Sequence, residues 1–481
     1  LSYSDTNAKG EGISPAYLIG SIRSLYPKLE IEGGAGVRPH KNSINNYCYP
    51  ENPEAGIDLF LEKLVQETEK EHEDILEQAD ETDAMFGELY SWYLRNPEYR
   101  SRVQKLVQSA FAGKPKDIIS QSVAKALYGE VSPYSATRLE RFAACAFAHF
   151  LQYGMKLTER VEYEFKPMDM GNVMHEALES FAEEVRKRGM KWTELTEQER
   201  NEIADRCLDN IVADYGNTVL KSSARNEYMI ERTRRILRRT VWALQKQLEQ
   251  GEFQPEGFEV TFGGGRIDRV DIMEDQNKVY VKVIDYKTGN TSFDLVYLYH
   301  GLQLQLMIYL DGALRVEQKK YPDKEIIPAG VFYYNIKDPM IQEKIDADVK
   351  AVSAGLMKEL KMNGLVQADP ELVYRMDSSL GSIPVAFNKD GSFRKNSSVA
   401  DRTQFAVLGR YVRTKIEKIR SSILEGDAEV SPYELGKKNA CTYCPYMTVC
   451  GFDRRLSGYE FRRLKNFSDE ELWKAFDREA E

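Results

Sequence analysis

An aspartate and a lysine two positions apart have the residue types and the spacing of a catalytic pair. Asp285 and Lys287 belong to the phrase VIDYKTG, and residues 278–286 before its end are rich in Val, Ile and Tyr, which predicts a β-strand. Because side chains alternate across a strand, we expect both on one face. Asp268, in the phrase GRIDRVD, is expected about a hairpin away. Two carboxylates and a lysine suit Mg²⁺ or Mn²⁺ and the hydrolysis of a phosphodiester.

Further residues along the chain strengthen this weak signal, because an Asp-x-Lys pair alone is usually a pair of surface charges. His175 lies in the amphipathic pattern MDMGNVMHEALESFAEEVRKRG, which predicts a helix, although a lone histidine there is usually structural or exposed. The pattern GLQLQLMIYL predicts a second helix with Gln305 and Tyr309 on one face, four residues apart. Glu259, in PEGFEVTF, is a candidate for an additional acid.

Four of the six cysteines have the arrangement of a metal site. Three lie close together in ACTYCPYMTVC and the fourth lies far upstream in ERFAACAF; they are Cys441, Cys444, Cys450 and Cys145. Zinc and a [4Fe–4S] cluster both accept four thiolates, so the spacing alone does not choose between them. Cys48 and Cys207 have no partner by spacing, and we expect ordinary core or surface thiols.

Taken together, these motifs resemble those of a known nuclease family. The phrases GNVMHEALE, GRIDRVD, VIDYKTG and QLMIY are similar to the RecB-type motifs of the PD-(D/E)xK superfamily. One cysteine before this set and three after it resemble the iron–sulfur nuclease domain of the AddB family, whose members are the second subunits of bacterial AddAB helicase–nucleases. The resemblance covers residues 132–460 well and the earlier part loosely.

The resemblance implies an α/β fold, with a central mixed sheet flanked by helices, stapled by a [4Fe–4S] cluster and preceded by a helical region. We expect the end of a helicase-like region at residues 1–50, a helical module at 51–130 and the iron–sulfur-stapled nuclease domain at 131–481. The first residue is Leu1, so a C-terminal fragment of a longer protein is expected. Members of the family carry more strand sequence before GRIDRVD, which leaves open whether a loop is missing near Gly263–Gly265.

The resemblance also implies a role for each site residue. The expected Mg²⁺ or Mn²⁺ ligands are His175, Asp268, Asp285 and the backbone carbonyl of Tyr286. Lys287 would steer or deprotonate the attacking water, and Gln305 and Tyr309 would support the site or the scissile strand. The implied ligands of the [4Fe–4S] cluster are Cys145, Cys441, Cys444 and Cys450, in a structural role.

The implied function is that of a Mg-dependent DNA nuclease domain of an AddB-like subunit, which resects double-strand breaks for recombinational repair. Single-stranded DNA and duplex ends would be its substrates, and an AddA-like helicase–nuclease partner would complete a heterodimer. The residues also allow a non-catalytic DNA-binding scaffold stapled by a metal cluster, or a nuclease of this fold that cuts RNA. They do not distinguish exonuclease from endonuclease cleavage, nor strand polarity, hotspot sequence or activity without the partner.

The overall composition is that of an ordinary soluble chain. Its 481 residues are 42% hydrophobic, without an apolar run long enough for a membrane helix or the start of a signal peptide, so we expect a cytoplasmic protein. A net charge of −10 excludes a surface that binds nucleic acid all over, but not a local basic tract. One such tract, RNEYMIERTRRILRRTVWALQK, is either a solvated helix face or a wall that contacts phosphates.

Overall fold

The computed structural model describes most of the chain and divides it into two compact units. The described residues are 17–28, 52–69, 81–110, 118–129, 135–158, 167–214, 223–263, 265–341, 348–456 and 458–480. The units are Leu1–Ala112 and Gly113–Glu481, and each is described by itself. Cys48 lies outside the described residues.

The described part of the first unit is helical, as the recurrence of apolar residues at three and four positions predicts. Its helices are α1 (Tyr17–Leu25), α2 (Pro53–Glu69), α3 (Glu81–Arg95) and α4 (Pro97–Ala110). Helices α2 to α4 enclose a small core in which Phe60 stacks on Phe86 and meets the edge of Tyr93. The Tyr93 hydroxyl donates a 2.7 Å hydrogen bond to the Pro53 carbonyl and ties α3 to the start of α2.

The second unit begins earlier than the boundary that the sequence suggests near Gly129–Ser132. Helix α5 (Gln121–Tyr128) packs on α15 (Arg402–Glu425), and its apolar face, with Ala124 and Tyr128, is buried there. The backbone N–H of Ile119 also donates to the carbonyl of Gly426, just beyond the end of α15. A helix with one apolar face needs a partner, and α5 finds it in the second unit, so that the earlier boundary follows from packing.

A six-stranded mixed sheet lies at the centre of the second unit, in the order β1-β2-β3-β4-β5-β6. The strands are β1 (Gln254–Phe262), β2 (Gly265–Asp275), β3 (Lys278–Lys287), β4 (Glu325–Asn335), β5 (Asn363–Gln367) and β6 (Val399–Ala400). The first three pair antiparallel, β3 and β4 pair parallel through the connecting helix α12 (Gln305–Lys320), and β4 pairs antiparallel with β5. The mixed sheet and the strand predicted at residues 278–286 are both confirmed.

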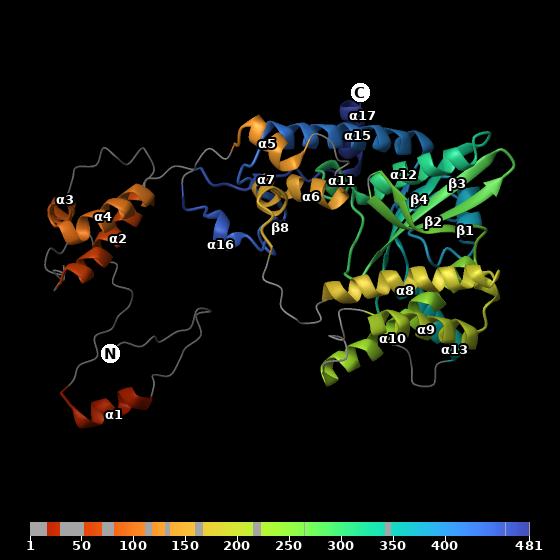
Figure 1. Ribbon diagram of the computed structural model, residues 1–481, viewed down its shortest axis with the longest axis horizontal. Coiled ribbons are helices and arrows are strands. Elements are labelled where there is room, and N and C mark those ends of the chain that lie inside the picture. The colour runs from red at the N-terminus through yellow and green to blue at the C-terminus, as the bar shows by residue number, and fades with distance from the viewer. Residues whose placement is uncertain are drawn as a thin grey trace. The chain divides into compact units, whose positions relative to one another are not determined.

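Helices cover both faces of this sheet and bury a separate core on each (Figure 1). On one face lie α8 (Pro167–Lys187), α9 (Glu197–Asp214) and α10 (Ala224–Leu248). On the other lie α6 (Ala136–Ala144), α12, α15 and α17 (Asp469–Ala480). The sheet is therefore enclosed, and polar side chains can be reached by solvent mainly where its strands end.

Short elements connect these layers. They are α7 (Ala146–His149), a π-helix (Phe150–Gly154), a 3-10 turn (Trp192–Glu194), α11 (Leu295–Tyr299), α13 (Val349–Glu359), α14 (Pro370–Met376) and α16 (Met447–Cys450). A small three-stranded sheet consists of β7 (Tyr433–Leu435), β8 (Lys438–Asn439) and β9 (Arg462–Arg463).

The glycine joint before the GRIDRVD phrase is a tight hairpin connection between β1 and β2. Phe262 pairs directly with Gly265, and Gly263 lies in the turn. Gly265 has a φ of +145°, which residues with a Cβ rarely adopt. Gly312 of α12 lies against the Phe262 ring, where a Cβ would come within 2.6 Å of a ring carbon. The strands thus pair up to the joint, and α12 packs closely over it.

Three charged side chains are buried together in the sheet, on the face that α8 covers. Arg269 donates two hydrogen bonds, of 2.5 and 2.9 Å, to the carboxylate of Asp271, and Lys282 Nζ lies 2.9 Å from the same group. The rings of Trp192 and Phe258 lie against the Arg269 guanidinium. Burial by itself would raise the pKa of Asp271, but the two cations hold this pKa below its ordinary value. This carboxylate therefore stays ionised in the core, where it neutralises part of the charge of its neighbours.

We predict that Asp271→Asn lowers the free energy of unfolding by about 3–5 kcal/mol at pH 7, because it leaves two buried cations without their counter-charge. Since the pKa of Asp271 is lowered on folding, the loss should be complete above the ordinary value of 3.8 and should shrink as the pH falls below it. Urea titration of both proteins at several pH values measures this difference.

The matched control is Glu274→Gln, which breaks the exposed pair of Glu274 with Lys324 on the same strand. It should cost less than about 1 kcal/mol. Equal losses from the two substitutions would show that the buried triad does not stabilise the sheet.

Candidate active site

The predicted catalytic pair lies at the carboxyl end of β3. Lys287 Nζ is 2.6 Å from Asp285 Oδ2, so the two side chains share a face of the strand as predicted. The Asp285 side chain is almost fully buried, whereas that of Lys287 is 27% exposed and can meet a ligand. The Lys287 ammonium also lies over the ring of Tyr333, on the neighbouring strand β4.

Helix α12 closes a hydrogen-bonded ring around this pair. The Gln305 side-chain oxygen accepts a 2.8 Å hydrogen bond from Lys287 Nζ, and its amide nitrogen donates at 2.9 Å to Asp285 Oδ1. The same nitrogen lies 2.9 Å from the hydroxyl of Tyr309, one helical turn further on. The structure thus brings together four of the predicted residues and holds the Lys287 ammonium at two points.

Asp268 joins β2 to β3 next to this ring. Its Oδ2 accepts a 2.7 Å hydrogen bond from the backbone N–H of Tyr286, which lies between the two catalytic residues in the sequence. Nδ1 of His175, on α8, is 3.4 Å from the same oxygen. His175 and Asp268 are thus adjacent, as predicted, although they are far apart in the sequence.

Glu259 completes a compact group with His175 and Asp268. These three residues each offer one ligand atom, and all three atoms lie within 4.8 Å of one another. Glu259 has a φ of +49° although it lies within β1, which is uncommon for a residue with a side chain. Its carboxylate is 3.8 Å from His175 Nδ1 and 2.5 Å from Arg266 Nε. The sequence indicates an acid here, but its place in this group depends on a backbone conformation that no pattern predicts.

Asp285 is not part of that compact group, because its carboxylate is directed toward Lys287 and Gln305. The predicted residues therefore form two adjoining sets among the described residues. One is His175, Glu259 and Asp268, and the other is Asp285, Lys287, Gln305 and Tyr309. The hydrogen bond from Tyr286 to Asp268 connects the sets through the backbone of β3.

The electrostatics of the site show an excess of negative charge. Burial raises the pKa of Asp285, and the nearby Asp268 carboxylate raises it further, while Lys287 opposes the shift. Burial would lower the pKa of His175, but hydrogen bonds to Asp268 and Glu259 raise this pKa to about 10. A positive charge is therefore strongly favoured between these carboxylates, which is the environment that a divalent cation requires.

The four predicted cysteines line one small pocket. Cys145 lies in extended conformation at the break between α6 and α7, and the other three lie on the loop that leads into α16. Burial raises the pKa of Cys441 to about 11, and the three neighbouring thiols raise it as well. Apolar side chains form the rest of the lining, including Phe147, Val430 and Phe452. Four converging thiols in an apolar pocket suit a four-thiolate metal site.

Backbone contacts fix the loop that carries these cysteines. The Asn439 side-chain oxygen accepts hydrogen bonds from the N–H groups of Cys441 and Thr442, at 2.9 and 3.0 Å. The N–H of Phe452 points to Cys450 Sγ at 3.5 Å, a contact that favours a thiolate. Cys207, in contrast, is buried in the core between α8, α9 and the sheet.

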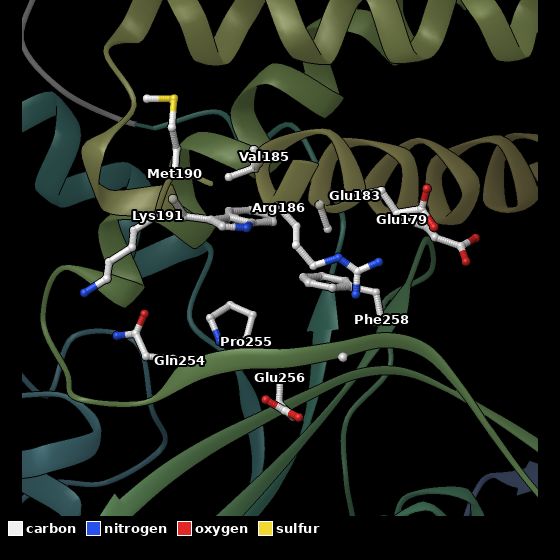
Figure 2. Close-up of a pocket in the computed structure, with 13 residues that line it drawn as sticks. Glu179, Glu183, Val185, Arg186, Met190, Lys191, Gln254, Pro255, Glu256 and Phe258 are labelled. Carbon is white, nitrogen blue, oxygen red and sulfur yellow. The ribbon is translucent and has the colours of Figure 1, made fainter. Parts of the chain in front are cut away.

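A separate pocket of about 200 Å³ lies between α8 and the edge strand β1. Figure 2 shows Glu179, Glu183 and Arg186 of α8 on one wall and Pro255 and Glu256 of β1 on the opposite wall. Glu179 is one helical turn beyond His175, but the lining includes neither set of site residues. The pocket therefore adjoins the candidate active site without being part of it.

The basic tract predicted as a helix is α10, and several of its cations are bound to acids. Arg234 contacts Asp205 and Asp209 of α9, and Arg238 also contacts Asp205. Arg235 forms a 2.6 Å ion pair with Asp338. These pairs hold α10 against α9 and favour a structural face over a wall that binds phosphates.

Among the described residues, no helix combines the length and the apolar character that crossing a membrane requires.

Comparison with known proteins gives two consistent results. The chain is similar throughout to proteins named as the second of the subunits that form an ATP-dependent helicase/deoxyribonuclease. It is 38% identical to that of Lachnoclostridium phytofermentans over 503 residues and 32% to that of Alkaliphilus metalliredigens over 508 residues, which is 100% of this chain and 42% and 43% of theirs. The chain therefore spans less than half the length of these curated relatives. A family model of the PD-(D/E)XK nuclease superfamily matches residues 133–451. Because that match includes the sheet, α8, α12 and all four clustered cysteines, the chain belongs to the PD-(D/E)XK nuclease superfamily and matches its AddB branch, as the motifs in its sequence implied.

Proposed function

We propose that this chain is the metal-dependent DNA-cutting part of a helicase–nuclease subunit. The observation that carries the proposal is the ring of Asp285, Lys287 and Gln305 at the end of β3, beside a cation-binding group. The family supports hydrolysis of a nucleic acid, and the relatives' printed names support DNA over RNA. A non-catalytic scaffold would not need a partly exposed lysine held at two points next to buried carboxylates.

The proposed cation ligands are His175, Asp268, Asp285 and the backbone carbonyl of Tyr286, with Glu259 as an additional acid. Their carboxylate oxygens are hard ligands that suit Mg²⁺ or Mn²⁺. When bound, such a cation would stabilise charge on the phosphate and favour ionisation of water. The excess negative charge of the site supports this assignment, because His175 now holds a proton where a cation would place its charge.

Lys287 is the proposed residue that orients the attacking water and receives its proton or stabilises its negative charge. Gln305 and Asp285 restrict the ammonium to one position, so that Lys287 loses little side-chain freedom when the substrate binds. Tyr309 contacts Gln305 and limits the rotation of this amide. In this scheme Gln305 and Tyr309 support the lysine and need not touch the DNA.

The proposed occupant of the cysteine pocket is a [4Fe–4S] cluster with a structural role, bound by Cys145, Cys441, Cys444 and Cys450. Zinc is the alternative that the same donor set accepts. Either group would tie the start of the nuclease domain to its end and close a long loop in the unfolded chain, which favours the folded state.

The whole protein is proposed to act with an AddA-like helicase–nuclease partner that supplies ATP-driven movement along DNA. Single-stranded DNA and duplex ends would be the substrates during resection of double-strand breaks for recombinational repair. Residues 1–50 are assigned to the end of a helicase-like region and the helices that follow to a packing module. The relatives' names, which join a helicase to a deoxyribonuclease, support this assignment.

We predict that Lys287→Met lowers the rate of Mg²⁺-dependent cleavage of labelled single-stranded DNA by a factor on the order of 10²–10⁴, because the proton-transfer and orienting group is lost. DNA affinity, measured by fluorescence anisotropy with the metal omitted, should change little. The control is Lys324→Met, an exposed lysine on the loop between α12 and β4 that should cut like the wild type. Cleavage by Lys287→Met at the wild-type rate would contradict the assigned role.

We predict that anaerobically purified protein is brown and contains about four iron and four sulfide ions per chain. Cys444→Ala should lose the visible absorption and the iron, whereas Cys207→Ala should keep both because Cys207 is a core residue. Elemental analysis and the visible spectrum measure these quantities. A colourless protein with one zinc ion would contradict the iron–sulfur assignment and leave the nuclease assignment intact.

A further inference from the structure

Glu140, which the motifs did not single out, holds the beginning of the helix that closes the active site. This residue lies on α6, far from α12 in the sequence. Its Oε1 accepts hydrogen bonds from the backbone N–H groups of Leu304 and Gln305, at 2.7 and 2.9 Å. Leu304, the N-cap of α12, provides no capping hydrogen bond from its own side chain. The cap of α12 therefore comes from another helix.

A cap at this position affects the site more than an ordinary helix cap does. The first N–H groups of a helix lack partners within the helix, and a carboxylate there is favoured by the positive end of the helix dipole. Gln305 is the first residue of α12, so the N–H that Glu140 binds belongs to the residue whose side chain contacts Lys287 and Asp285. Glu140 thus fixes the backbone of Gln305, while the catalytic pair fixes its side chain.

Glu140 also lies within the electrostatic environment of the site. Burial raises the pKa of Glu140 to about 7, while the two backbone N–H groups and the Lys287 ammonium oppose the shift. The carboxylate is therefore in a poorly solvated place, where each hydrogen bond to it is strong and its loss is costly.

The helix that carries Glu140 is itself firmly held. Leu139, Phe142 and Ala143 on α6 are buried in the core shared with α12 and α15. At the other end of α6, the Arg462 guanidinium donates to the carbonyl of Ala143, and the following residue in the helix cap is Cys145. Glu140 is thus attached to a rigid support and can impose its position on α12.

We propose that Glu140 is a positioning residue of the nuclease reaction, which fixes the first turn of α12 and thereby holds Gln305 against Lys287 and Asp285. It need not contact the DNA or the metal. The inference rests on the proposed nuclease function, because it is the cleavage rate that depends on the placement of Lys287. Small displacements of a catalytic group can lower a rate on the order of 100-fold.

The test compares Glu140→Ala with Glu140→Gln in cleavage of single-stranded DNA with Mg²⁺. Glu140→Ala should lower kcat by a factor on the order of 100 while KM for DNA stays close to the wild-type value. Glu140→Gln keeps an oxygen that can accept from both N–H groups, so it should recover most of the lost kcat. In a Gln305→Ala background, Glu140→Ala should cause little further loss, because Glu140 acts through Gln305.

The matched control is Glu317→Ala, which removes a buried carboxylate from the opposite end of α12, where Glu317 pairs with Lys320. It should lower the stability of the helix without lowering kcat. Equal losses of kcat from Glu140→Ala and Glu317→Ala would show general destabilisation of α12 and overturn the inference.

Hydrogen exchange provides a readout that does not depend on cleavage. The amides of Leu304 and Gln305 should exchange faster in Glu140→Ala than in the wild type or in Glu140→Gln. If the wild-type protein does not cut DNA, the proposed function fails, and unchanged exchange would also remove the cap. If the wild type cuts and Glu140→Ala cuts equally well, the inference about Glu140 alone is wrong.

Discussion

Three carboxylates converge at one end of the central sheet, and the rest of the site compensates for their charge. Glu259, Asp268 and Asp285 each have little contact with solvent, so every one needs a positive or hydrogen-bonding partner. Arg266, His175 and Lys287 supply the positive charge, and backbone and amide N–H groups supply the hydrogen bonds. This requirement explains why α8, β1 and α12 meet at the end of β3.

The strand period lets β2 serve two purposes at once. Asp268 lies on one side of the strand and contacts the active site, whereas Arg269 lies on the other, in the buried triad with Asp271 and Lys282. A shift of register by one residue would exchange these faces and place the wrong charges in the site. The triad thus stabilises the sheet and also fixes the register on which the catalytic geometry depends.

Much of the site could be predicted from the sequence because its central parts are local. Alternation along β3 placed Asp285 and Lys287 on one face, and helical spacing in α12 placed Gln305 next to Tyr309. The parts that could not be predicted depend on tertiary contacts. Glu259 reaches His175 only through a positive φ, and Glu140 caps a helix with which it shares no sequence pattern. The domain boundary moved for the same reason, since α5 finds its partner far along the chain.

One helix physically connects the two chemical sites of the second unit. Helix α6 contacts the start of α12 through Glu140, and it ends at Cys145 in the cysteine pocket. Its nine residues form a short rigid rod, because a helix resists bending over so few turns. A group bound by Cys145 and the three late cysteines would fix the far end of this rod. The cysteine pocket therefore need not take part in the chemistry to matter for it, because it helps to define where α12, and with it the Lys287 ammonium, is held.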